Sequence, residues 1–230
     1  RRSLRSADHD HDAVPPPPLD SSSGKPPNSD TAAVDTCDVA CRRRQHAALE
    51  SIYDALGGPD WVDDGGWHGA EDPAAPGPAD RPVDRGADAG AHCRWDGVVC
   101  CTPSRTVVLT EGDSHTHVLP CPVPGGVYAL LLGGNGLKGG GLPRGALAAL
   151  APSLVYLDLH GNRISGPAPF SELRDARHLR DLYLNSNAFE GSILPDDVAA
   201  WPRVIYLNVA GNRLGGELPA AALARLPALK

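Results

Sequence analysis

Histidine, aspartate and cysteine are the residues of this chain whose spacing could support metal binding. The run DHDHD, from Asp8 to Asp12, places two imidazoles among carboxylates that could hold a divalent ion. It lies in a segment rich in proline and serine with few apolar residues to fix it, so we interpret it as a solvated polar run. His115 and His117 would share one face of a strand, but two ligands without a third fixed group do not make a zinc site.

Catalytic motifs are absent from the sequence. It contains no GxSxG element, no HExxH element and no phosphate-binding loop, and no carboxylate pair stands in a recognisable catalytic spacing. We therefore expect no enzyme, no cofactor and no metal. The formal net charge of −7 argues against nucleic acid as a partner, since phosphate contacts need clustered lysine and arginine. The one basic run, Arg42 to Arg44, falls on an expected helix and is interpreted as a solvated face.

The cysteines indicate an oxidising, extracellular compartment. The chain has six in 230 residues and none in a CxxC pair of the zinc type, which favours disulfides over metal ligation. No apolar run of 18 residues is present, so we expect no membrane span in this chain. The first residues have no apolar core of a signal peptide, and we expect that a leader was removed before Arg1.

A repeat provides the elements that would position polar side chains. Four stretches place apolar residues at positions 1, 4, 6 and 11, asparagine at position 9 and glycine at position 13. They begin at Val127, Leu154, Leu179 and Val204. The asparagines are Asn135, Asn162, Asn187 and Asn212, with periods of 27, 25 and 25 residues. A period in this range indicates a solenoid.

The spacing also assigns a face to each side chain. Positions 4 and 6 are two residues apart, which in a strand sends both side chains to the same, inward face. Stacked turns would form a parallel sheet with strands about 4.8 Å apart. The asparagines are expected inside the turns, where their amides satisfy backbone groups that no strand ladder reaches. The expected inward pairs are Leu130 and Leu132, Leu157 and Leu159, Leu182 and Leu184, and Leu207 and Val209.

Positions 3, 5 and 7 would face outward and form the candidate binding surface. In the first repeat, the residues at these positions are Ala129, Leu131 and Gly133. In the last repeat, position 7 is Ala210. The candidates for binding are Tyr156, Asp158, His160, Asp181, Tyr183, Asn185, Tyr206 and Asn208. Tyrosine offers broad contact area with a hydroxyl, and neighbouring Asp and Asn offer directional hydrogen bonds, a mixture found at recognition surfaces. The alternative is that tyrosine is simply a good strand residue facing solvent.

The repeat resembles the plant-type leucine-rich repeat family, whose unit runs LxxLxLxxNxLxGxIP. The closing apolar-proline pair stands at Leu142-Pro143, Ala168-Pro169, Leu194-Pro195 and Leu218-Pro219. Upstream, HAALESIYDALGGPDW from His46, then Trp67, and CRWDGVVC from Cys93 are similar to the N-terminal cap of plant-type ectodomains. The resemblance implies an α/β solenoid, namely a leucine-rich repeat right-handed superhelix with a parallel concave sheet and a helical, disulfide-bonded N-terminal cap.

The resemblance also implies that Cys93 and Cys100 form the disulfide of the cap. Between Cys101 and Cys121, the runs RTVVLT, EGDS and HTHVLP alternate well enough to form a hairpin that turns at residues 111–114 and brings these two cysteines together. Cys37 would then pair with Cys41, one helical turn away. Because four cysteines allow three pairings, these last two bridges stay open.

The chain divides into three parts. Residues 1–35 form a Pro/Ser-rich tail, residues 36–125 the cap with a loop insertion at 70–91, and residues 126–230 four leucine-rich repeats plus the start of a fifth. In the cap, a helix is expected from near Asp38 to Gly57. Its apolar face would hold Val39, His46, Leu49, Ile52, Tyr53 and Leu56. The tail resembles the hydroxyproline-rich, O-glycosylated segments of plant and green-algal wall proteins. The candidates for O-glycosylation are Pro15, Pro16, Pro17, Pro18, Ser21, Ser22 and Ser23.

Two functions follow from this reading. The first is an extracellular recognition domain, secreted or at the cell surface, that binds a protein, peptide or glycan ligand through its concave face. The second is a structural subunit of a glycosylated extracellular matrix or filament, in which the partner is another copy of the chain.

Overall fold

The computed structural model describes residues 36–67, 91–102, 104, 106–111 and 115–230. The expected tail, with the DHDHD run and the O-glycosylation candidates, lies outside the described residues, as does all of the expected insertion except Ala91.

The N-terminal helix α1 spans Val39–Ala55 and begins where the sequence predicts. The Asp38 carboxylate accepts a hydrogen bond from the backbone N–H of Cys41 at 2.7 Å, which caps the first turn. Gly57 ends the helix in a left-handed conformation, with φ at 74°, that glycine adopts without strain. One expectation was wrong: the Val39 side chain is 56% exposed because it precedes the part of the helix that packs on the repeats.

The rest of the cap closes one edge of the main sheet. A short helix η1 (Gly58–Asp60) and a second, η2 (Ala91–Arg94), lead to strand β1 (Val98–Cys100). Strands β2 (Thr106–Glu111) and β3 (His115–Pro120) pair antiparallel, so the expected hairpin is confirmed. The aromatic side chains of the cap pack edge to face and stacked around one another, with ring centroids 4.8 to 5.9 Å apart. They are Tyr53, Trp61, Trp67 and Trp95.

The repeats build a five-stranded sheet in the order β1-β4-β6-β8-β10. Its strands are β4 (Val127–Leu131), β6 (Tyr156–Asp158), β8 (Asp181–Tyr183) and β10 (Tyr206–Asn208), preceded by β1, which pairs antiparallel with β4. The four repeat strands are parallel and in register, as the sequence predicts, with Leu130, Leu157, Leu182 and Leu207 aligned across them. The right-handed superhelical course stays a prediction.

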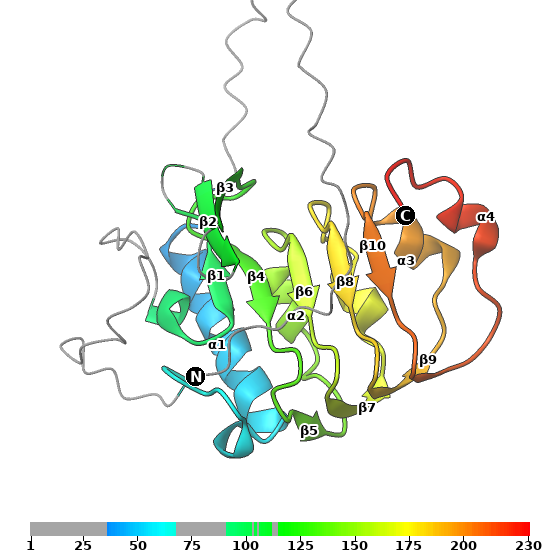
Figure 1. Ribbon diagram of the computed structural model, residues 1–230, viewed down its shortest axis with the longest axis horizontal. Coiled ribbons are helices and arrows are strands. Elements are labelled where there is room, and N and C mark those ends of the chain that lie inside the picture. The colour runs from blue at the N-terminus through cyan, green and yellow to red at the C-terminus, as the bar shows by residue number, and fades with distance from the viewer. Residues whose placement is uncertain (1–35, 68–90, 103, 105, 112–114) are drawn as a thin grey trace, which may run out of the picture.

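Short helices stack behind this sheet in chain order (Figure 1). They are α2 (Ala146–Leu150), η3 (Pro169–Leu173), α3 (Pro195–Ala199) and α4 (Ala220–Leu223), and α1 packs against α2. The expected inward leucines of the first three repeats are buried, whereas Leu207 and Val209 in the last repeat are partly buried.

A second parallel sheet, which the sequence did not predict, joins the four turns after the asparagines. It contains β5 (Lys138–Gly139), β7 (Arg163–Pro167), β9 (Ala188–Gly191) and β11 (Arg213–Leu214). Of the glycines at position 13, Gly139, Gly166 and Gly191 lie in these strands and Gly216 follows β11. All four have positive φ. At Gly166 a Cβ would also overlap the carbonyl oxygen of Gly140 in the preceding turn. Both constraints explain why the repeat carries glycine at this position.

The asparagines form the expected ladder inside the turns. The Asn162 amide donates to the carbonyl oxygens of Leu132 at 2.8 Å and Leu159 at 2.9 Å. Its Oδ1 accepts from the backbone N–H of Asn135 at 3.1 Å and of Leu137 at 3.0 Å. One side chain therefore satisfies buried backbone groups of two successive turns.

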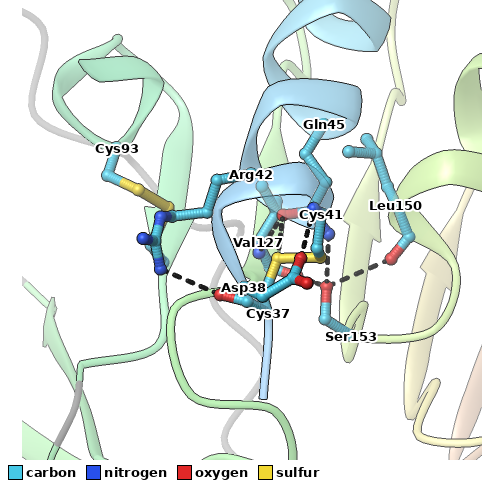
Figure 2. Close-up of a disulfide and its surroundings, with 10 residues drawn as sticks. Cys37, Asp38, Cys41, Arg42, Gln45, Cys93, Val127, Leu150 and Ser153 are labelled. Atoms are coloured by element: carbon cyan, nitrogen blue, oxygen red, sulfur yellow. Dashed lines mark hydrogen bonds between the residues drawn. A yellow bond between two sulfur atoms is a disulfide. The ribbon is translucent and has the colours of Figure 1, made fainter. Parts of the chain in front are cut away.

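A buried glutamine, Gln45, joins the cap helix to the repeats (Figure 2). Its Oε1 accepts from the backbone N–H of Val127 at 3.0 Å, and its Nε2 donates to the Ser153 hydroxyl at 2.9 Å. The Ser153 oxygen in turn lies 2.9 Å from the carbonyl oxygen of Val127. This network fixes α1 against the first two repeats, and the sequence reading missed it although Gln45 stands one helical turn before Leu49.

Candidate functional site

The outer side of the five-stranded sheet carries the candidate binding residues in two rows. Backbone register places Ala129, Tyr156, Asp181 and Tyr206 side by side in one row. The next row holds Leu131, Asp158, Tyr183 and Asn208. Adjacent strands in a sheet are about 4.8 Å apart, so neighbours in a row are within contact distance. We call the part of this surface on β6, β8 and β10 the open sheet face.

Strand β4 is left out of the open sheet face, because a second, small apolar cluster buries Ala129 on its outer side. Ala129 was expected to face solvent but is only 1% exposed. The cluster that buries it contains Cys101, Val107, Cys121, Tyr128, Ala129 and Val155, with Leu131 and Tyr156 partly buried against it. The cap therefore covers the outer side of β4 from the side of the β2–β3 hairpin. A signal was available: the run VYALL of β4 is continuously apolar, which is typical of a strand buried on both faces.

Three disulfides hold the cap. They join Cys37 to Cys41, Cys93 to Cys100 and Cys101 to Cys121, with Cα atoms 5.1, 5.5 and 5.8 Å apart. These are the pairs that the resemblance and the hairpin favoured. His92, Cys93 and Cys100 bring one possible ligand atom each within 4.8 Å of one another. Because both sulfur atoms belong to the disulfide, this group has no thiolate to offer a metal.

Two tyrosines of the open sheet face, Tyr156 and Tyr183, have their rings in contact. The ring centroids of Tyr156 and Tyr183 are 5.6 Å apart, with the planes tilted by 37°. Burial raises the pKa of Tyr156 far above its usual range, and the nearby Tyr183 and carboxylates act in the same direction. Burial also raises the pKa of Tyr183. Both hydroxyls are therefore protonated at neutral pH.

Asp181 lies at the centre of the open sheet face, between Tyr156 and Tyr206 on the neighbouring strands. The side chain is half-buried, and this burial raises the pKa of the carboxyl to about 6, opposed in part by the charge of Arg180. Among the described residues, no hydrogen-bond donor or cation within salt-bridge distance pairs with this carboxylate. Asp181 is thus a partly desolvated acid without a partner.

Asp158, the other acid of the face, is already engaged. Its Oδ1 lies 2.6 Å from Nδ1 of His160 and also accepts from the His160 backbone N–H at 2.9 Å. Asn208 makes the corresponding turn in the last repeat, where its Oδ1 accepts from the backbone N–H of Ala210 at 3.2 Å. Asn185 follows the end of β8, and its buried Oδ1 has no hydrogen-bond partner. All eight candidate binding residues therefore lie on the outer side of β6, β8 and β10 or directly after these strands.

A cation already lies on one end of this surface. Nζ of Lys230 stands 5.7 Å from the ring centroid of Tyr206. The backbone N–H of Lys230 donates to the carbonyl oxygen of Ile205 at 2.9 Å, in the same manner that Ile205 bonds to Arg180 and Arg180 to Val155. Lys230 therefore continues the sheet ladder.

Comparison with known proteins supports the repeat and the fold. A family model described as Leucine Rich Repeat matches residues 153–173. The BIR2 ectodomain from Arabidopsis thaliana is similar in structure, with a TM-score of 0.55 and 25% identity over 80% of this chain and 76% of that chain. A search of curated proteins found no match.

Two crystal structures of the Arabidopsis receptor kinase HAESA also share the fold. Its leucine-rich repeat ectodomain in complex with an N-terminally extended IDA peptide hormone gives a TM-score of 0.52 at 18% identity, over 84% of this chain and 24% of that chain. The complex of HAESA with IDA and the co-receptor SERK1 gives 0.54 at 21% identity, over 81% and 24%. In the described part of this chain, no helix is both long and apolar enough to cross a membrane.

Proposed function

We propose that the chain is an extracellular recognition module that binds a peptide or a protein partner on the open sheet face. The observation that carries the proposal is the concentration of Tyr156, Tyr183 and Tyr206 around the unpartnered Asp181. Recognition surfaces combine aromatic contact area with a few polar groups that fix orientation. A partly desolvated carboxylate without a partner is a feature more typical of functional sites than of structural surfaces.

The fold supports this assignment by leaving the open sheet face as the polar and aromatic side of the sheet. The inward leucines are buried in the core, and the asparagines are engaged in the turns, so neither set is available to a ligand. The HAESA structures, which share the fold, are complexes with a peptide hormone, and one includes a co-receptor. The three disulfides of the cap agree with an extracellular location.

The test is to pan a displayed library of linear peptides on the protein and to measure the binding of the selected peptides by calorimetry. Replacing Tyr156, Tyr183 and Tyr206 together with alanine is expected to weaken binding by at least about tenfold, because aromatic anchors dominate such interfaces. The control variant replaces Val62 and Leu194, exposed apolar residues outside the open sheet face, and is expected to bind normally.

Normal binding by the triple tyrosine variant would show that the site lies elsewhere. Two other partners were proposed from the sequence, a glycan and a second copy of the chain. Binding of wild type, the triple tyrosine variant and the control variant to a glycan array tests the glycan. Sedimentation of the protein without peptide tests self-association.

A further inference from the structure

The open sheet face surrounds one carboxylate with aromatic rings. Asp181 lies directly opposite Tyr156 on one neighbouring strand and Tyr206 on the other. Tyr183, two residues further along β8, places its ring 5.6 Å from that of Tyr156. Tyrosine faces carry negative electrostatic potential, and a carboxylate between them adds a full negative charge. Charge and shape both favour a cationic group at this position.

Comparison with the other shielded carboxylates of the chain shows that Asp181 is exceptional among the described residues. Asp197 accepts from Nε of Arg174 at 3.3 Å and from the backbone N–H of Leu194 at 3.1 Å. Glu172 accepts from the backbone N–H of Gly145 at 2.7 Å. Both carboxylates are satisfied, as shielded charges normally are. The missing partner of Asp181 can therefore come from a ligand.

The structure contains an example of a cation at the edge of this arrangement. Nζ of Lys230 lies 5.7 Å from the ring centroid of Tyr206 and makes no salt bridge with Asp181. A metal ion fits the centre less well, because hard cations need several oxygen ligands and the other acid of the face, Asp158, is engaged by His160. An organic cation needs only the carboxylate and the ring faces.

We propose that the open sheet face binds a basic side chain of its peptide ligand, a lysine or an arginine, over Asp181 and between Tyr156 and Tyr206. The proposal rests on the proposed function, since it names the chemistry of the ligand at that same surface. The carboxylate accepts hydrogen bonds from the cation, and the tyrosine rings flank it and exclude water.

Ionisation of Asp181 makes this binding dependent on pH. Burial raises the pKa of Asp181 to about 6 in the free protein, and a bound cation favours the ionised form. Affinity therefore rises as the pH increases through about 6. The other charged or titratable groups near Asp181 are Arg180, Asp158, His160, Lys230 and the three tyrosines.

The experiment uses peptides selected from the displayed library on the wild-type protein. The expected result is a lysine or arginine common to the selected peptides. Replacing that residue with alanine, or replacing Asp181 with asparagine, is expected to weaken binding by about tenfold each, and the two changes together by little more than either alone. Asp175→Asn, which removes one exposed charge outside the sheet, is expected to bind as wild type.

Two outcomes overturn the proposal and differ from a failure of the proposed function. The basic-residue proposal is wrong if the selected peptides share no basic residue, or if Asp181→Asn binds them as tightly as wild type. In that case, a loss of binding in the triple tyrosine variant still supports the open sheet face as the binding surface. If the triple tyrosine variant also binds normally, the surface itself is wrong. Asp181→Asn is expected to melt no lower than wild type, since it removes a partly desolvated charge, so a loss of binding is not caused by unfolding.

Discussion

The buried His92 gives the cap a dependence on pH that can be worked out from its surroundings. Its side chain is 1% exposed, and neither ring nitrogen has a hydrogen-bond partner. Burial lowers the pKa of His92 to about 4, and the neighbouring His46 and Arg42 act in the same direction. The ring of His46 lies 5.6 Å away on α1. Protonation of His92 therefore places an unpaired charge inside the cap, between η2 and α1.

The sign and size of this effect on the free energy of unfolding follow from the difference between the His92 pKa values of the folded and unfolded chains. The unfolded chain takes up the proton near pH 6.5 and the folded chain only near pH 4, so stability present above about pH 6.5 is lost as the pH falls. The two pKa values give a loss of about 2 kcal/mol at pH ~5 and about 3 kcal/mol at pH ~4. Asp181 acts in the opposite direction, because its raised pKa lets the folded chain take up a proton first.

Replacing His92 with leucine isolates the histidine from the other titrating groups. Leucine is similar in size and loses no hydrogen bond, since the imidazole makes none. The assay is urea unfolding of wild type and variant at about pH 7 and pH 5, followed by tryptophan fluorescence, which reports on the adjacent Trp95. We expect wild type to lose about 2 kcal/mol more than the variant between these pH values. Equal losses in both proteins would refute the reasoning.

Four further variants test the fold. Leu182→Asp is expected to unfold the repeats, since it buries an unpaired charge, whereas Tyr183→Asp on the outer side should keep the native circular dichroism; equal loss in both would mean that the strand register is wrong by one residue. Asn162→Ala should cost about 3 kcal/mol in urea unfolding, because it leaves several buried backbone groups without partners, and a cost below about 1 kcal/mol would contradict the ladder. Replacing Cys93 and Cys100 together with alanine should cost about 2.5 kcal/mol by loop entropy, and an unchanged midpoint would contradict a role of this bridge in cap stability.

The repeat strands could be predicted from the sequence because their constraints are local. Two leucines two residues apart share a strand face wherever they occur, and a fixed period stacks one strand on the next. The asparagine at position 9 and the glycine at position 13 are also required by the local backbone. Asn162 bonds to backbone carbonyl groups, and Gly166 adopts a positive φ. Each of these residues meets the same demand in every turn, so four copies of the pattern reinforce one prediction.

The cover over β4 and the bond network of Gln45 do not follow from the repeat pattern, although the apolar run of β4 indicates burial on both faces. Both depend on contacts between parts of the chain that are far apart in sequence. Val107 of the hairpin packs near Ala129, and Gln45 bonds to Ser153, more than a hundred residues away. The pattern of the repeat has no information about which outer positions the cap covers. For that reason the predicted surface included Ala129, which the cap buries.

The residue between the tyrosines, Asp181, favours the proposal that the open sheet face is a binding surface over the alternative that its tyrosines are only strand formers. If the tyrosines were only strand formers facing solvent, position 3 of the third repeat would need no charge. The equivalent positions hold Ala129, Tyr156 and Tyr206, so the same backbone accepts side chains that are uncharged at neutral pH. Asp181 instead adds a half-buried carboxylate whose ionisation costs at most about 3 kcal/mol, and about 1 kcal/mol after allowing for solvent. No hydrogen bond or salt bridge among the described residues offsets this cost in free energy. Such a cost is expected where the carboxylate makes its hydrogen bond or salt bridge with a ligand.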